Sequence, residues 1–201
     1  MISFFTTRIL DFLKFSEAIE CDENNLDIYK YGIEITLSTI LNILIILILS
    51  LIYGSFFTGI IFLLVFIPLR KFTGGYHADT YMKCNIVFAI LYTSVFWLTK
   101  ILYKYTDVHI IEAILAISFI VVYIFSPIEN PHKALDTDEK RKYRMLSIIT
   151  YILFTAIAIA ISHVFYYISV CMMITMLSII VLIIIPVIQN HLWNNPKFFW
   201  L

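Results

Sequence analysis

A histidine and a cysteine lie seven residues apart in a polar stretch of an otherwise apolar chain. His77 and Cys84 belong to the segment 70–84, which also contains the pair Gly74-Gly75. An imidazole beside a thiol can act as the base that generates a nucleophilic thiolate. The segment is basic and Cys84 opens an apolar run, and both positive charge and a helix N-terminus favour the thiolate. These residues indicate catalysis by a cysteine nucleophile. The alternative is that the two side chains share a loop without acting together.

Spacing restricts how the two side chains can meet. Seven residues of continuous helix would place His77 and Cys84 on one face but about 10 Å apart along the axis, too far to exchange a proton. A catalytic pair therefore requires the chain to fold back after Gly74-Gly75. Glycine permits the positive φ angles of such a turn, so we expect a turn at the glycine pair and Cys84 at the start of a helix.

The composition excludes a soluble domain. The chain has 201 residues, of which 61% are apolar, whereas soluble domains have about 45–50%, and its mean hydropathy is +0.92. The 14 basic and 14 acidic residues give no net charge, which argues against a nucleic-acid partner. Three scattered cysteines are too few for a disulfide framework or a paired-cysteine zinc site. The partner of most of this surface is therefore expected to be the lipid bilayer.

Long uncharged stretches predict the transmembrane helices. No charge occurs from Ile35 to Leu69, and one span needs only about 20 apolar residues, so two spans share this stretch with a break at Gly54-Ser55. We predict an all-α, polytopic integral membrane protein, a single domain over 1–201. About six transmembrane helices are expected at 34–53, 56–70, 84–103, 109–127, 145–163 and 168–188.

Three polar segments flank or separate these spans. Residues 1–33 are predicted to hold an N-terminal amphipathic helix in the membrane interface, because apolar residues recur there at helical spacing between charged ones. A helix packed on the protein's own loops is the alternative. The charges also interrupt every apolar run, which excludes a cleaved signal peptide. The other two segments are the candidate catalytic loop 70–84 and a second loop, 127–144.

The basic residues predict the orientation in the membrane. Lys and Arg concentrate on the cytoplasmic side, and with alternating loops only Lys100 and Lys104 fall on the opposite side. We therefore expect both termini and both long loops to be cytoplasmic. The other 12 of the 14 basic residues lie on that side: Arg8, Lys14, Lys30, Arg70, Lys71, Lys83, Lys133, Lys140, Arg141, Lys142, Arg144 and Lys197.

The candidate loop resembles that of a known family. In a multispan chain of this length, it resembles the accessory gene regulator B (AgrB) family, membrane cysteine peptidases of peptide quorum sensing in Gram-positive bacteria. A second loop, from Ser126-Pro127 to Arg144, supports the resemblance. The residues that carry it are Arg70, Gly74, Gly75, Tyr76, His77, Ala78 and Cys84.

The resemblance implies a reaction, a partner and a location. Members cleave the C-terminal part of an AgrD-like autoinducing-peptide precursor and cyclise the product as a thiolactone or lactone. Cys84 then matches the nucleophile and His77 its base, with Arg70, Gly74 and Gly75 as supporting positions of the motif. The resemblance also implies a homodimer in the bacterial cell membrane.

Several assignments stay open at this level. Asp79 or Glu129 is a possible orienting acid for His77, or each is a solvated loop acid. No cofactor or metal is expected, because no nucleotide-binding or zinc motif occurs and the one conceivable ligand set is His77, Cys84 and His132. The alternative function is a small membrane transporter or peptide exporter without catalytic activity. It is disfavoured because the spans carry few polar residues. A non-catalytic scaffold is a third possibility.

Overall fold

The regular structure of the described residues is helical. The computed structural model describes residues 2–16, 23–76, 80–128 and 136–193. Six of the described helices are long and apolar enough to span a membrane, which confirms the predicted class. The helices are α1 (Ile2–Phe15), α2 (Glu23–Ile52), α3 (Phe56–Thr73), α4 (Tyr81–Leu102), α5 (Val108–Phe125), α6 (Thr137–Ser162) and α7 (Tyr166–Trp193).

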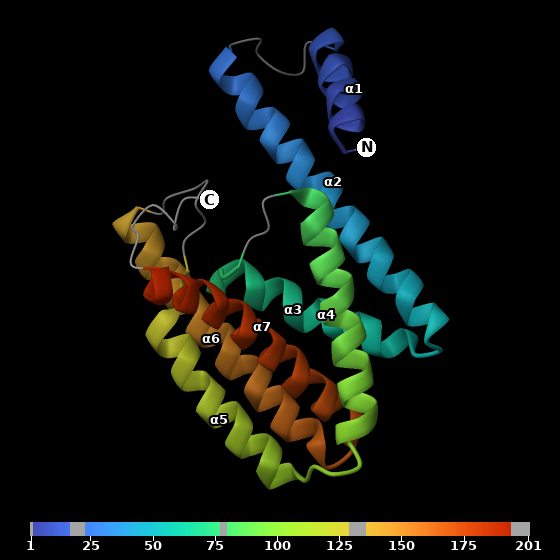
Figure 1. Cartoon of the computed structure of the whole chain (residues 1–201), viewed down its shortest axis with the longest axis vertical. Coiled ribbons are helices and arrows are strands. Elements are labelled where there is room, and N and C mark those ends of the chain that lie inside the picture. The colour runs from blue at the N-terminus through green and yellow to red at the C-terminus, as the bar shows by residue number, and fades with distance from the viewer. Residues whose placement is uncertain (1, 17–22, 77–79, 129–135, 194–201) are drawn as a thin grey trace.

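Helix α7 is the centre of the bundle. It packs against α3, α4, α5 and α6, while α2 packs against α3 and α4 (Figure 1). In its most apolar window 67% of α7 is buried inside the protein, compared with 17% for α2. A helix surrounded by other helices is apolar on all sides, which explains the nearly unbroken Ile, Leu and Met sequence of α7.

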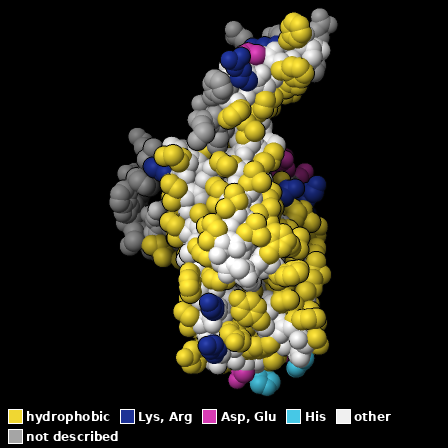
Figure 2. All heavy atoms as spheres, turned by 90° about the vertical axis from the view of Figure 1, so that its right-hand side faces the viewer, with side chains coloured by type: hydrophobic (Ala, Val, Ile, Leu, Met, Phe, Trp, Pro, Cys, Tyr) yellow, Lys and Arg dark blue, Asp and Glu magenta, His cyan; other side chains and the backbone are white. Residues whose placement is uncertain are grey.

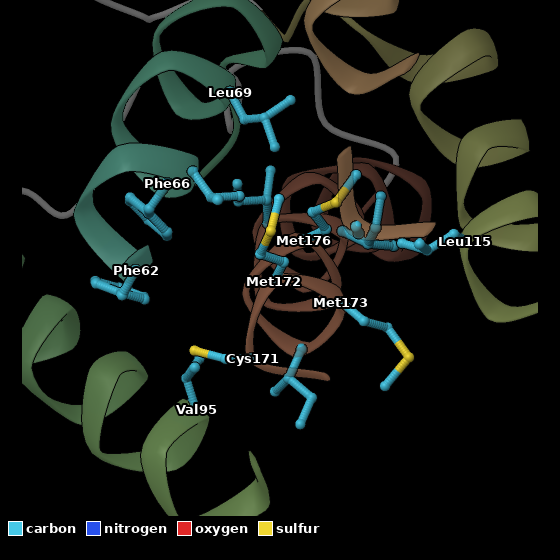
Figure 3. Close-up of a cluster of buried hydrophobic side chains, with 14 of the residues drawn as sticks. Phe62, Phe66, Leu69, Val95, Leu115, Cys171, Met172, Met173 and Met176 are labelled. Carbon is cyan, nitrogen blue, oxygen red and sulfur yellow. The ribbon is translucent and has the colours of Figure 1, made fainter. Parts of the chain in front are cut away.

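The core consists of side chains that α7 shares with its neighbours. Met172 and Met176 lie between α3 and α5, and Phe62 and Phe66 of α3 stack with their ring centroids 5.0 Å apart (Figure 3). Flexible methionine side chains fill the irregular space between aromatic and aliphatic neighbours. This packing holds α3 against α7, and both helices contribute to the site described below.

The outer surface of the bundle is apolar. Figure 2 shows hydrophobic side chains over most of one face, with charged side chains at the top, near the bottom and in a group at the right-hand edge. Large side chains such as Leu64, Ile90 and Ile117 are 63%, 59% and 67% exposed. Such a surface is stable against lipid tails rather than water.

Helix α1 packs along α2, apart from the central bundle (Figure 1). Phe12 and Phe15 are 68% and 89% exposed, so the apolar side of α1 is only partly covered by protein. Of the two alternatives for this helix, the exposure favours a helix in the membrane interface, whose apolar side contacts lipid.

The helices extend further than the sequence predicts, and both long loops are correspondingly shorter. Helix α3 continues through Pro68 to Thr73, and α4 begins at Tyr81 after the cap Thr80, whose hydroxyl accepts the N–H of Lys83 at 3.3 Å. Helix α6 begins at Thr137, because Asp136 and Glu139 form a capping box. The basic run 140–144 is therefore helical.

Candidate active site

The glycine pair ends α3 in a turn. Gly74 has a φ of 67° and its N–H donates to the carbonyl of Arg70 at 3.2 Å, and Gly75 has a φ of 124°. Residues with a Cβ rarely adopt these angles. The positive φ angles predicted for this pair are therefore confirmed, and they turn the chain away from the axis of α3.

The second loop is joined to this turn. The N–H of Ile128 donates to the carbonyl of Thr73 at 2.9 Å, and Gly74 and Ile128 form an isolated parallel β-bridge. The hydroxyl of Ser126 also donates to the Thr73 carbonyl at 3.4 Å. A Cβ on Gly74 would collide with the carbonyl oxygen of Ile128. Glycine is therefore required here for close approach as well as for the turn.

Both backbone groups of Tyr76 form hydrogen bonds to residues of helices. Its N–H donates to the carbonyl of Leu182 in α7 at 2.8 Å. Its carbonyl accepts a hydrogen bond from Nη2 of Arg70 in α3. Tyr76 directly precedes His77, so the chain enters the segment of the candidate base from a backbone held by two helices.

Arg70 is directed into the protein rather than towards the membrane edge. Nη2 of its guanidinium donates to the Tyr76 carbonyl. Nη1 is buried with no hydrogen-bond partner among the described residues. A Cβ on Gly75 would collide with Nη1. The guanidinium is close enough to Cys84 to interact with its thiol electrostatically. A buried, partly unsatisfied cation is costly, which is typical of a functional site.

Cys84 lies where the sequence places it, in the first turn of α4. Its N–H donates to the carbonyl of Thr80 at 3.0 Å, and its side chain is a half-buried free thiol. The next residue, Asn85, is buried and its Oδ1 accepts a bond from the Ser38 hydroxyl at 3.1 Å, which attaches this end of α4 to α2. Burial of the side chain opposes a thiolate here, and the helix N-terminus and the Arg70 charge act against that effect.

Cys171 has a contrasting environment. It is fully buried and lies in the core beside Val95 (Figure 3). Its surroundings are apolar side chains and the hydroxyls of Thr99 and Thr175, with no described cation beside it. A thiol buried in this way is a packing residue.

The remaining predicted site residues lie outside the described residues. These are His77, Asp79 and Glu129, so the pairing of His77 with Cys84 and the orientation of His77 by either acid stay predictions. The sequence does not point to the carbonyl of Leu182, which accepts the N–H of Tyr76. Backbone atoms leave no mark in a sequence, although Pro186, four residues later, is a signal that this carbonyl lacks its usual helical donor.

The fold and site together define a multi-pass helical membrane protein with a half-buried cysteine beside a buried arginine. A family model, Accessory gene regulator B, matches residues 6–194, and the chain belongs to this family.

Two relatives come from Clostridium perfringens. An AgrB-like protein 2 of strain 13 / Type A is 27% identical over 150 residues, 70% of each chain. An AgrB-like protein of strain SM101 / Type A is 28% identical over 153 residues, 72% of this chain and 71% of the relative. No solved structure matches.

Membership of this family connects the chain to the processing of quorum-sensing peptides by a multi-pass membrane protein. The matched residues include the glycine turn, the second loop and Cys84.

Proposed function

We propose that the protein is a membrane cysteine endopeptidase that cleaves the C-terminal part of an AgrD-like precursor peptide and promotes its cyclisation. The observation that carries the proposal is the position of Cys84, half-buried at the start of α4 beside the buried guanidinium of Arg70. Family membership supports a peptide of this kind as the substrate.

Acylation begins with proton transfer from the Cys84 thiol to His77. The thiolate then attacks the scissile carbonyl, and the resulting tetrahedral intermediate expels the amine of the C-terminal fragment, which takes the proton from His77. The N-terminal part of the peptide remains bound to Cys84 as a thioester. The Arg70 charge and the N-terminus of α4 stabilise the thiolate that forms once His77 has taken the proton.

One donor near the turn is suited to the oxyanion of the intermediate. The N–H groups of Gly74 and Tyr76 are already donated, to Arg70 and Leu182, and the bridge between Gly74 and Ile128 engages the backbone beside them. That leaves Nη1 of Arg70, which lacks a partner among the described residues. A fixed donor of this kind stabilises developing negative charge strongly in a site that excludes water.

Cyclisation uses the energy of the thioester. An internal thiol of the bound peptide attacks the thioester in a nearly isoenergetic exchange, or a hydroxyl attacks it downhill, and Cys84 leaves as the thiolate. His77 takes the proton of the attacking group and returns it to Cys84. Water would give a linear product instead, and a site between apolar helices limits its access.

The buried polar side chains favour a peptidase over an exporter. Within the described residues, the side chains that are buried as a whole have only hydroxyls and Asn85 as polar members, while Arg70 is partly exposed and buries only its guanidinium end. Ionisable residues facing the interior of a bundle are typical of transport paths. Polar chemistry concentrates instead at the end of the bundle that carries Arg70 and Cys84.

Trapping the thioester tests the proposed reaction. The full-length protein in lipid nanodiscs is mixed with an AgrD-like precursor, quenched with acid and weighed by mass spectrometry. We expect an adduct equal to the N-terminal fragment, located on Cys84 and released by neutral hydroxylamine, and much less of it in His77→Ala. Cleavage without any hydroxylamine-sensitive adduct in rapid-quench samples would contradict the mechanism.

Loss of the Arg70 charge is expected to slow acylation about a hundredfold, the order observed when one oxyanion donor is removed. Arg70→Gln can still bond the Tyr76 carbonyl but no longer supplies a positive charge to Cys84. Lys71→Gln is the matched control, because Lys71 is the exposed neighbour with the same charge. Rates of adduct formation check the prediction, and equal rates in the two variants would remove Arg70 from the mechanism.

The orientation is a further part of the proposal. In a background without native cysteines, Asp138→Cys at the start of α6 should react with a membrane-impermeant maleimide only after cells are permeabilised. Tyr105→Cys, at a position 76% exposed between α4 and α5, should react in intact cells. The reverse pattern would place the site outside the cell, where a cytoplasmic precursor does not reach it.

A further inference from the structure

Helix α7 presents one backbone carbonyl to the candidate active site. Pro186 lies inside this helix and has no N–H, so the carbonyl of Leu182, four residues earlier, lacks its usual helical donor. Leu182 is only 4% exposed, and an unpaired carbonyl in an apolar interior is unfavourable. It accepts instead the N–H of Tyr76 at 2.8 Å.

The same carbonyl requires glycine beside it. A Cβ on Gly75 would lie 2.7 Å from the Leu182 oxygen, closer than a carbon atom and a carbonyl oxygen can approach. The turn therefore fits α7 through two features, a carbonyl freed by Pro186 and a residue without a side chain. Arg70 donates a hydrogen bond to the carbonyl of Tyr76.

We infer that Pro186 is a positioning residue of the active site. It leaves the Leu182 carbonyl available to Tyr76, and so fixes the backbone that leads into His77. The inference rests on the proposed function, since it assigns Pro186 to the acylation step. A catalytic base must be held within a fraction of an ångström of its productive position, and the residue that precedes His77 is fixed through both its N–H and its carbonyl.

The test restores the missing donor. Pro186→Ala supplies an N–H that competes with Tyr76 for the Leu182 carbonyl, while alanine remains favourable for the helix. In the full-length protein in nanodiscs, we expect the Tyr76 amide hydrogen to exchange about tenfold faster and the Cys84 thioester to form about tenfold more slowly, as for one lost hydrogen bond. The affinity for the precursor should change little, because the contact is with the turn and not with the peptide.

A matched variant separates the hydrogen bond from the shape of the proline ring. Lactic acid incorporated at position 186 by nonsense suppression replaces the amide with an ester, which lacks both the ring and the N–H. If the free carbonyl is the cause, this variant retains the exchange rate and acylation rate of the wild type. Equal losses in the ester and in Pro186→Ala would assign the effect to the ring and overturn the inference.

The two readouts keep this inference apart from the proposed function. Unchanged Tyr76 exchange in Pro186→Ala would overturn the inference, as would faster exchange with normal acylation. The exchange of the Ile128 amide, which bonds Thr73, serves as an internal reference for global unfolding. Failure of the proposed function would appear differently, as an absence of the Cys84 thioester in the wild type, and the amide exchange would still report the Tyr76 contact.

Discussion

Cys84→Ala is expected to abolish cleavage of the precursor, with a loss of about a thousandfold or more, because it removes the atom that forms the covalent bond. The substitution deletes one half-buried sulfur at the start of α4 and leaves the Asn85 contact with Ser38 in place. We therefore expect the variant to insert normally and to bind the precursor. Co-expression with the precursor, followed by mass spectrometry of the medium and membranes, measures the loss.

The other cysteines provide the controls. Cys171 is fully buried in the core, and Cys171→Ala is expected to retain cleavage, as is Cys21→Ala, whose cysteine follows and precedes acidic residues. A thiol reagent should label Cys84 fastest near neutral pH, because Cys84 has the Arg70 charge beside it, whereas Cys171 is fully buried and Cys21 lies between acidic residues. Release of the cyclic product by Cys84→Ala would end the hypothesis that Cys84 is the catalytic cysteine of a peptidase. A loss of cleavage confined to Cys171→Ala would mean that the catalytic cysteine lies in another part of the fold.

Gly75→Ala is expected to reduce cleavage at least tenfold by displacing the turn. The new Cβ would collide with Nη1 of Arg70 and lie 2.7 Å from the Leu182 carbonyl oxygen, at a φ of 124° that side chains rarely adopt. Backbone strain of this kind costs about 1–3 kcal/mol. The nearest relief is to move the turn away from α7, which breaks the Tyr76 contact and shifts Arg70. Acylation rates measured in nanodiscs would register that movement.

Gly54→Ala is the matched control for this substitution. Gly54 also has a positive φ, of 65°, but a Cβ there would meet nothing within 4 Å. It therefore suffers backbone strain without a collision, at the end of α2 away from Cys84. We expect Gly54→Ala to keep near-normal cleavage while both variants insert into the membrane. Equal activity in the two would mean that the space beside Gly75 is not part of the site.

The amino-acid sequence by itself predicts the class of fold and the place of the candidate nucleophile. Six spans follow from apolar runs of about 20 residues, and Gly54-Ser55 separates the first two as expected. The positive φ angles of Gly74 and Gly75 follow from residue type, because only glycine adopts them freely. The start of the apolar run likewise places Cys84 in the first turn of a helix. All of these are properties of short, continuous segments of the chain, from a single turn to one span.

Only the tertiary structure decides what surrounds the cysteine. In the sequence, Arg70 is only a supporting position of the motif, whereas the packing of α3 on α7 directs it inward to Tyr76. The pairing of Gly74 with Ile128 joins two loops that are more than fifty residues apart in the chain. The contact of Tyr76 with Leu182 uses backbone atoms that every residue shares. Hydrogen bonds between such atoms have no residue signature, so they become visible only once the helices that carry them are packed together.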